Sequence, residues 1–154
     1  MNKKYLQKAI ELAKKNIESG GGPFGAVIVK DGIIIAEEAN RVTPDNDPTA
    51  HAEILAIRSA ASKLKSWDLS GCELYTSCEP CPMCLGAVYW AHIDKVYFSA
   101  SHDDARDAGF DDADMYNEMQ KNPSERKISM VSALEEKGKN VFAKWKEKEN
   151  KIEY

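Results

Sequence analysis

The sequence predicts an α/β protein, a three-layer α/β/α sandwich built on a mixed five-stranded sheet. Short β-branched runs alternate with helical segments, and two of these runs, residues 24–30 and 33–37, are joined by Asp31-Gly32. Asp-Gly between two such runs is a strong hairpin signal, so these strands are expected to be antiparallel. Two later strands are separated by a helix, which predicts a parallel pair with a right-handed crossover.

The first helix precedes the hairpin. Apolar residues recur at a helical period from Tyr5 to Ile17, and the helix is expected to continue to about Glu18. The run Gly20-Gly21-Gly22-Pro23 then ends it. One face of this helix should therefore be buried.

The second helix is expected to carry polar residues of functional interest. Residues 40–48 have the composition of a loop, and Asp47-Pro48 predicts a helix start, with Asp as the cap and Pro at the first helical position. The helix would extend to Leu64, with His51 and Glu53 in its first turns.

The remaining elements complete the predicted sheet and its covering helices. The expected strands are residues 72–77, 95–99 and 128–132, and the expected helices are residues 83–91, part of 103–120, and 141–151.

Length, composition and charge limit the class of protein. A chain of 154 residues fits one domain, residues 1–154, that buries roughly two-thirds of its unfolded surface. No apolar run approaches the ~20 residues of a membrane span, and the start lacks a signal-peptide pattern, so we expect a cytoplasmic protein with reduced cysteines. The net charge of −4 argues against binding along a nucleic-acid backbone.

A metal site is predicted from two segments. Cys81 and Cys84 lie three residues apart at the start of a predicted helix, and two thiolates one turn apart can bind one ion. His51 supplies a third ligand, which leaves the fourth tetrahedral position of one zinc ion for water, as in catalytic zinc sites. Glu53, two residues after His51, is the candidate proton carrier.

Two further cysteines leave another interpretation to weigh. Cys78, Cys81 and Cys84 share a three-residue spacing that could begin an iron–sulfur ligand run. The fourth cysteine of such a run is missing after Cys84, and Cys72 lies upstream in a predicted strand. We therefore interpret Cys72 and Cys78 as packed residues.

The segments His51-Ala52-Glu53 and Pro80-Cys81-Pro82-Met83-Cys84 form the H-x-E and P-C-x-x-C signature of zinc-dependent nucleoside and nucleobase deaminases. The chain thus resembles the cytidine-deaminase-like superfamily over most of its length. Residues 22–27, 46–53, 108–112 and 151–154 resemble the bacterial guanine deaminases in particular. This resemblance implies zinc on His51, Cys81 and Cys84, with Glu53 shuttling protons as guanine is hydrolysed to xanthine and ammonia.

The resemblance also implies which residues contact the purine. Asn40 and Asp112 match the family's purine-binding positions, although Asp111 remains an alternative to Asp112. Guanine presents N–H donors that a carboxylate accepts, whereas adenine has an acceptor at N1. Ala52 and Phe24 are the other candidate contacts within the core of the chain.

A homodimer is also implied by the resemblance. Guanine deaminases of this type exchange their C-terminal segments, here about residues 133–154, and the final Tyr closes the partner's pocket. The corresponding residue is Tyr154.

Two other functions remain open at this point. A tRNA adenosine deaminase has similar His and Cys segments, but should show a basic surface around its pocket, whereas this chain is acidic overall. A non-catalytic zinc-binding module should supply a fourth protein ligand, whereas this sequence has Glu53 in the position of a proton carrier.

Overall fold

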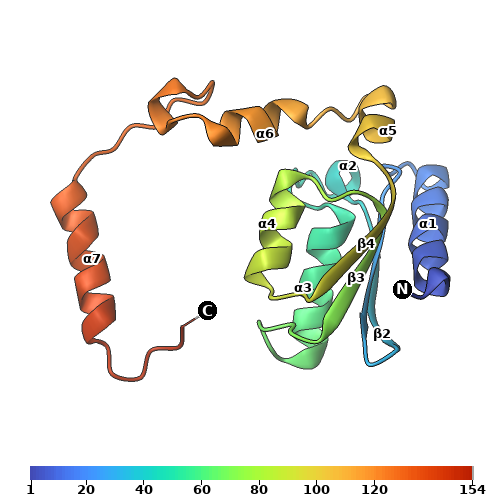
Figure 1. Cartoon of the computed structure of the whole chain (residues 1–154), viewed down its shortest axis with the longest axis horizontal. Helices are drawn as coiled ribbons and strands as arrows, with labels where there is room; N and C mark the ends of the chain where they lie inside the picture. Colours follow the sequence, from blue (N-terminus) through green and yellow to red (C-terminus); the bar gives the residue numbers. More distant parts are fainter. Residues whose placement is uncertain (154) are drawn as a thin grey trace. The chain divides into compact units, whose positions relative to one another are not determined.

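A four-stranded mixed sheet forms the centre of residues 1–112 (Figure 1). Its strands are β1 (Gly25–Lys30), β2 (Ile33–Ala39), β3 (Cys72–Cys78) and β4 (Lys95–Ala100), in the spatial order β2-β1-β3-β4. β1 pairs antiparallel with β2 and β3, and β3 pairs parallel with β4, as the sequence predicts. This computed structural model describes residues 1–153, and the predicted site residue Tyr154 lies outside them.

Helices precede, connect and follow these strands. In residues 1–112 they are α1 (Lys3–Glu18), α2 (Val42–Asp45), α3 (Ala52–Leu64), α4 (Pro82–Trp90) and α5 (His102–Asp107). Residues 113–154 form a second unit with α6 (Ala113–Gln120), the 3₁₀ helix η1 (Pro123–Glu125) and α7 (Glu135–Glu147).

Three layers surround the core of the first unit. α1 covers one face of the sheet, and α3 and α4 cover the other (Figure 1). Alternating β1 side chains explain this arrangement: Val27 and Val29 pack on the α1 side with Tyr5, whereas Ala26 and Ile28 pack with α3 and α4. β1 is therefore buried on both faces.

The structure corrects the prediction of a fifth strand. Residues 128–132 form no strand, and the exposed fractions of Ile128 and Val131 are 82% and 86%. The β-branched run has the composition of a strand, but composition alone does not supply the neighbouring strand whose backbone must accept and donate the ladder hydrogen bonds.

The structure also corrects the predicted start of the helix next to His51. α3 begins at Ala52 with His51 at the N-cap position, not at Asp47-Pro48. The Asp47 carboxylate accepts from the backbone N–H and the hydroxyl of Thr49, at 2.8 and 2.7 Å, so it closes a local turn rather than capping a helix. The preceding loop also contains the short helix α2, which its composition did not reveal.

The last helix is displaced toward the N-terminus relative to the prediction. α7 spans Glu135–Glu147 rather than 141–151. Glu135 and Glu136 occupy its first turn, where negative charge favours the helix dipole. The charged residues at 135–140 thus belong to a helix despite their lack of an apolar stripe.

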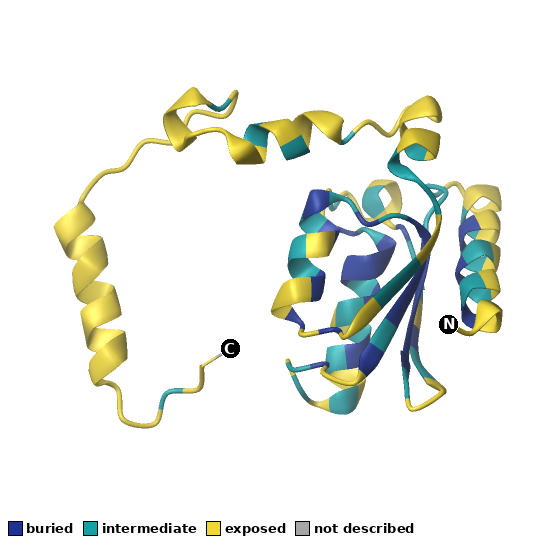
Figure 2. Ribbon diagram, in the orientation of Figure 1, coloured by how far each residue is buried: buried dark blue, intermediate teal, exposed yellow. Residues whose placement is uncertain are grey.

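The described part of the second unit, residues 113–153, has no core of its own. None of the described residues 113–153 is buried, and Figure 2 shows α7 exposed along its whole length. Across the described residues, no helix is both long enough and apolar enough to cross a membrane. All four cysteines carry free thiols, and Cys72 and Cys78 are buried, which agrees with their interpretation as packed residues.

We predict that Gly25→Ala destabilises the fold. A methyl group here would collide with the α1 backbone, including the Ala9 carbonyl oxygen and, at 2.8 Å, the Ala13 nitrogen. Such overpacking should lower the free energy of unfolding by about 2 kcal/mol, measured by urea denaturation at equal zinc content. Gly86→Ala is the control: an added Cβ there meets nothing within 4 Å, so this variant should be neutral or more stable by up to about 1 kcal/mol. Equal stability of both variants would contradict the close approach of Gly25 to the α1 backbone.

Candidate active site

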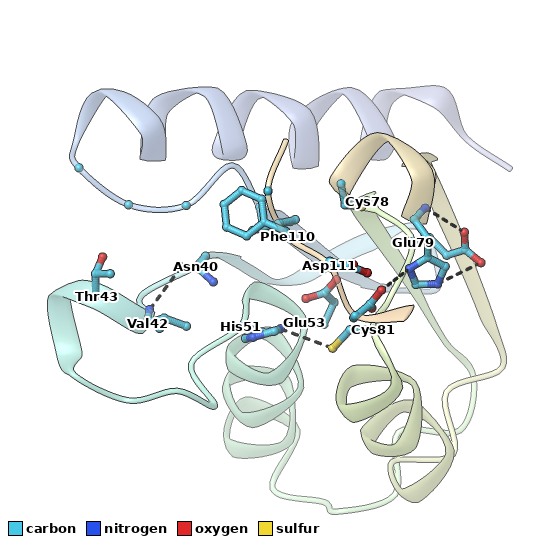
Figure 3. Close-up of a pocket in the computed structure, with 18 residues that line it drawn as sticks. Asn40, Val42, Thr43, His51, Glu53, Cys78, Glu79, Cys81, Phe110 and Asp111 are labelled. Carbon is cyan, nitrogen blue, oxygen red and sulfur yellow. Dashed lines mark hydrogen bonds and ion pairs between the residues drawn. The ribbon is translucent and has the colours of Figure 1, made fainter. Parts of the chain in front are cut away.

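One end of the sheet holds a cavity of about 600 Å³ (Figure 3). β2, β3 and β4 end here, and β1 begins here. The residues next to these strand ends line the cavity: Phe24 before β1, Asn40 after β2, Glu79 after β3 and His102 near the end of β4. The topology therefore gathers side chains from distant parts of the sequence.

His51, Cys81 and Cys84 form a group able to hold one metal ion. His51 Nδ1 lies 3.6 Å from Cys81 Sγ and 3.5 Å from Cys84 Sγ. Tetrahedral zinc with ordinary Zn–N and Zn–S bonds places these atoms about 3.6 Å apart. Both nitrogen–sulfur distances thus agree with the spacing that a zinc ion requires.

Two of these candidate ligands are N-cap residues that do not cap their helices. His51 and Cys81 are the N-cap residues of α3 and α4, both with extended backbone, and neither side chain caps its helix. An N-cap side chain normally accepts a hydrogen bond from the first turn. Both side chains instead point toward each other (Figure 3), while Cys84 approaches from within the first turn of α4.

The electrostatics of the group favour a thiolate. The pKa of Cys81 is lowered to about 4, mainly by a hydrogen bond from Cys84 and to a smaller extent by one from His51. The anionic partner raises the pKa of Cys84, because its proton is then shared with Cys81. The hydrogen bond to Cys81 also raises the pKa of His51. Cys81 is therefore prepared as an anionic ligand by its neighbours.

Glu53 lies beside this group and is almost fully buried, with 4% of its surface exposed. Burial raises the pKa of its carboxyl group, despite the Thr76 hydroxyl that donates to Oε1 at 2.9 Å. The Cys84 thiol lies 3.5 Å from Oε2. The structure thus holds a carboxyl group of increased proton affinity at the cavity floor, next to the ligand atoms.

Asn40 presents its amide to the cavity. The Val42 backbone N–H donates to Asn40 Oδ1 at 3.3 Å, so the Nδ2 end points toward the open space (Figure 3). The Asn16 amide holds this corner from behind, donating to the carbonyl oxygens of Gly22 and Asn40 at 2.8 Å each. The position of Asn40 is therefore determined by α1 as well as by its own loop.

The other predicted contacts differ in their placement. Phe24 lines the cavity and packs edge-to-face against Phe110, with ring centroids 4.9 Å apart. Asp111 and Asp112 both line the cavity. Ala52 is fully buried in the core on the α3 side of the sheet and is not among the residues that line the cavity.

Sequence reasoning missed several residues of this site: Asn16, Thr76, Glu79, His102 and Phe110. A usable signal existed for two of them. Thr76 is a polar residue on the inward face of a strand, two residues before Cys78, and His102 follows the strand parallel to the one that ends at Cys78. Asn16 carried no signal, because its partners lie beyond the end of its helix.

Comparison with known proteins identifies the class. Residues 1–100 match the family described as the cytidine and deoxycytidylate deaminase zinc-binding region. The chain belongs to this family of zinc-binding deaminases, and its sheet and helices have the cytidine-deaminase-like fold.

Individual proteins similar to this chain include guanine deaminases and a tRNA-specific adenosine deaminase. The chain is 52% identical over 151 residues to guanine deaminase of Bacillus subtilis (strain 168), which covers 97% of each protein. The X-ray structure of guanine deaminase from B. subtilis matches with a TM-score of 0.96 and 51% identity, covering 100% of this chain and 99% of that one. A tRNA-specific adenosine deaminase of Aquifex aeolicus is 50% identical over 101 residues, or 65% of this chain and 67% of that protein.

We predict that Thr76 positions the Glu53 carboxylate. Thr76→Val keeps the shape but removes the donor at 2.9 Å, and should lower kcat for deamination by about tenfold. Zinc content should not change, because Thr76 contacts no ligand atom among the described hydrogen bonds. Thr76→Ser restores the hydroxyl and should recover most of the rate. A Ser variant as slow as the Val variant would show that packing, not the hydrogen bond, matters at this position.

Proposed function

We propose that this protein hydrolyses guanine to xanthine and ammonia. The observation that carries the proposal is the similarity to guanine deaminase of B. subtilis along nearly the whole chain, at 52% identity. The cavity supports it, since a site of about 600 Å³ can accommodate a nucleobase next to the metal-ligand group and a buried carboxyl group.

His51, Cys81 and Cys84 would hold one zinc ion per active site. Their mutual spacing and the lowered pKa of Cys81 support this assignment. When bound, zinc supplies Lewis acidity that lowers the pKa of a water ligand to about 7. The remaining steps belong to the chain's own side chains.

Glu53 would carry protons during the reaction. Its carboxylate takes a proton from the attacking water and passes it to the ring nitrogen next to the carbon under attack. It then relays the second proton, from the hydroxyl group added to that carbon, to the amine; the C–N bond breaks, a carbonyl group forms, and the amine leaves as ammonia. Burial supports this role, because a carboxyl group of raised pKa accepts and holds a proton more readily than an exposed one.

The cavity walls would recognise the purine. The Nδ2 group of Asn40 can donate to a ring nitrogen or carbonyl oxygen, and the Asp112 carboxylate can accept from the N–H donors of guanine. Phe24 and Phe110 offer an aromatic wall for a flat base. Contact between Ala52 and the purine remains a prediction.

The alternatives receive less support. Similarity to the tRNA-specific deaminase of A. aeolicus extends over 65% of this chain, whereas similarity to the guanine deaminase extends over 97%. A non-catalytic zinc module would not need a buried carboxyl group beside an open cavity.

Because thiolate ligands must stay reduced, we further propose that the protein acts in a reducing compartment, the cytoplasm.

The decisive experiment is ammonia release by zinc-loaded protein supplied separately with guanine, adenine, cytosine, cytidine and a tRNA anticodon stem-loop. We expect turnover of guanine alone.

Glu53→Gln should lower kcat by several orders of magnitude while zinc content and fold are kept, because the amide cannot carry a proton. Turnover of the RNA alone would refute the proposed substrate, and full activity of zinc-loaded Glu53→Gln would remove Glu53 from the mechanism.

We also propose that the chain acts as one deaminase domain in a homodimer that exchanges C-terminal segments, about residues 133–154. The exposed side chains of the second unit support this proposal, because a segment without buried residues gains no stability from a core of its own. Exposed apolar side chains occur in both units: Tyr89, Trp90 and Phe98, and Val141, Phe142 and Trp145. In this arrangement Tyr154 would close the partner's cavity.

Complementation tests the exchange. Glu53→Gln and Tyr154→Ala chains should each be poorly active alone, but mixed dimers combine an intact Glu53 with a Tyr154 from the other subunit. Co-expression should therefore restore about a quarter of wild-type activity per subunit, as half of the dimers are mixed and each has one complete site. Chains that keep their own C-terminal segments would show no recovery, and a monomer in light scattering would exclude the homodimer.

A further inference from the structure

A histidine links two carboxylates on one wall of the cavity. His102 Nδ1 lies 3.3 Å from Asp112 Oδ1, and its Nε2 lies 3.5 Å from Glu79 Oε1. The His102 backbone N–H also donates to Glu79 Oε2 at 3.4 Å. Figure 3 labels Glu79 on this wall of the cavity and draws its ion pair as a dashed line. The three side chains thus form a connected series, Glu79–His102–Asp112.

The backbone is held more firmly at the Glu79 end of this series than at the Asp112 end. Glu79 directly follows β3, and its backbone N–H donates to the Ala100 carbonyl at 2.9 Å, which continues the sheet ladder. His102 begins α5, whose start is fixed by a capping box between Ser101 and Asp104. Asp112 instead follows a turn after α5 and belongs to no helix or strand. His102 therefore connects an irregular segment to a rigid part of the sheet.

Charge gives this link a second effect. Glu79, Asp112 and Glu53 all line the cavity, so the wall is rich in acidic groups. An imidazole between two carboxylates separates them, and in its protonated form donates to both. Without it, mutual repulsion would favour rotation of the Asp112 carboxylate toward solvent.

We propose that His102 is a positioning residue for substrate recognition: it holds the Asp112 carboxylate toward the cavity, where it accepts the N–H donors of guanine. This inference rests on the proposed guanine deaminase function and names the residue that determines its purine specificity through Asp112. The Nδ1 side of the ring performs the positioning, and the Nε2 side connects the ring to Glu79. His102 itself touches no reacting atom.

Two substitutions separate the two sides of the ring. The Nδ2 of His102→Asn can take the place of Nδ1 and donate to Asp112, whereas the Nε2 of His102→Gln can take the place of the ring Nε2 and reach Glu79. His102→Ala removes both contacts. His92→Asn is the matched control, because His92 lies outside the residues that line the cavity and its side chain contacts Asp68 instead.

Binding is measured without turnover, by calorimetric titration of 8-azaguanine into zinc-loaded Glu53→Gln protein that carries each second substitution. His102→Ala and His102→Gln should weaken binding about tenfold, the loss of one charge-assisted hydrogen bond, and His102→Asn should remain within about twofold of its parent. In the Asp112→Ala background, His102→Ala should cause no further loss, because a residue that acts through Asp112 has nothing left to position. In the Glu53-containing enzyme, KM for guanine should rise about tenfold with kcat nearly unchanged.

Each other outcome contradicts the inference. Equal losses from Ala, Asn and Gln, additive losses with Asp112→Ala, or depleted zinc would make His102 a structural residue. Unchanged binding in His102→Ala would remove it from recognition altogether. Wild-type protein that leaves guanine intact while 8-azaguanine binding follows the expected order would overturn the proposed function but not the positioning role. Failure of 8-azaguanine to bind the parent would overturn both.

Discussion

The convergence of two helix N-termini at one end of the sheet is the constraint on which the site depends. His51 and Cys81 are the N-cap residues of α3 and α4, and the first turn of α4 adds Cys84. Positive helix ends favour anionic thiolates, and the shared proton between the two cysteines strengthens this effect. A shift of either helix by one residue would move its ligand to another face of the helix. The packing of both helices on one face of the sheet therefore sets the spacing of the three candidate ligand atoms.

The same convergence explains why a carboxyl group lies in the interior. Glu53 is buried because it follows His51 into the first turn of α3, directly over the sheet. Thr76 on β3 compensates one oxygen with a hydrogen bond, while burial still raises the carboxyl pKa. Burial of such a group costs stability. A rigid three-layer core in residues 1–112 offsets that cost, whereas the described residues of the second unit contribute no core.

Sequence patterns predicted the features that depend on neighbouring residues. The hairpin at Asp31-Gly32 and the parallel crossover around α4 are confirmed, since turn chemistry and short connections decide them locally. The strand at 128–132 was wrong, because a strand also needs a partner. The helix start at Asp47-Pro48 was wrong, because the Asp47 side chain had an equally local alternative in Thr49. Patterns of this kind establish preference, not pairing.

The sequence by itself determined the chemistry: two thiols and an imidazole with metal-ligand spacing, and a carboxyl group two residues from His51. Only the tertiary structure decided which further side chains surround that chemistry. Asn16 on α1 donates to the carbonyl oxygen of Asn40. His102 on α5 contacts both Glu79, which follows β3, and Asp112, which lies in an irregular segment. These contacts arise at the end of the sheet where β2, β3 and β4 finish and β1 begins. Their partners are distant in sequence, so no local periodicity or spacing encodes them.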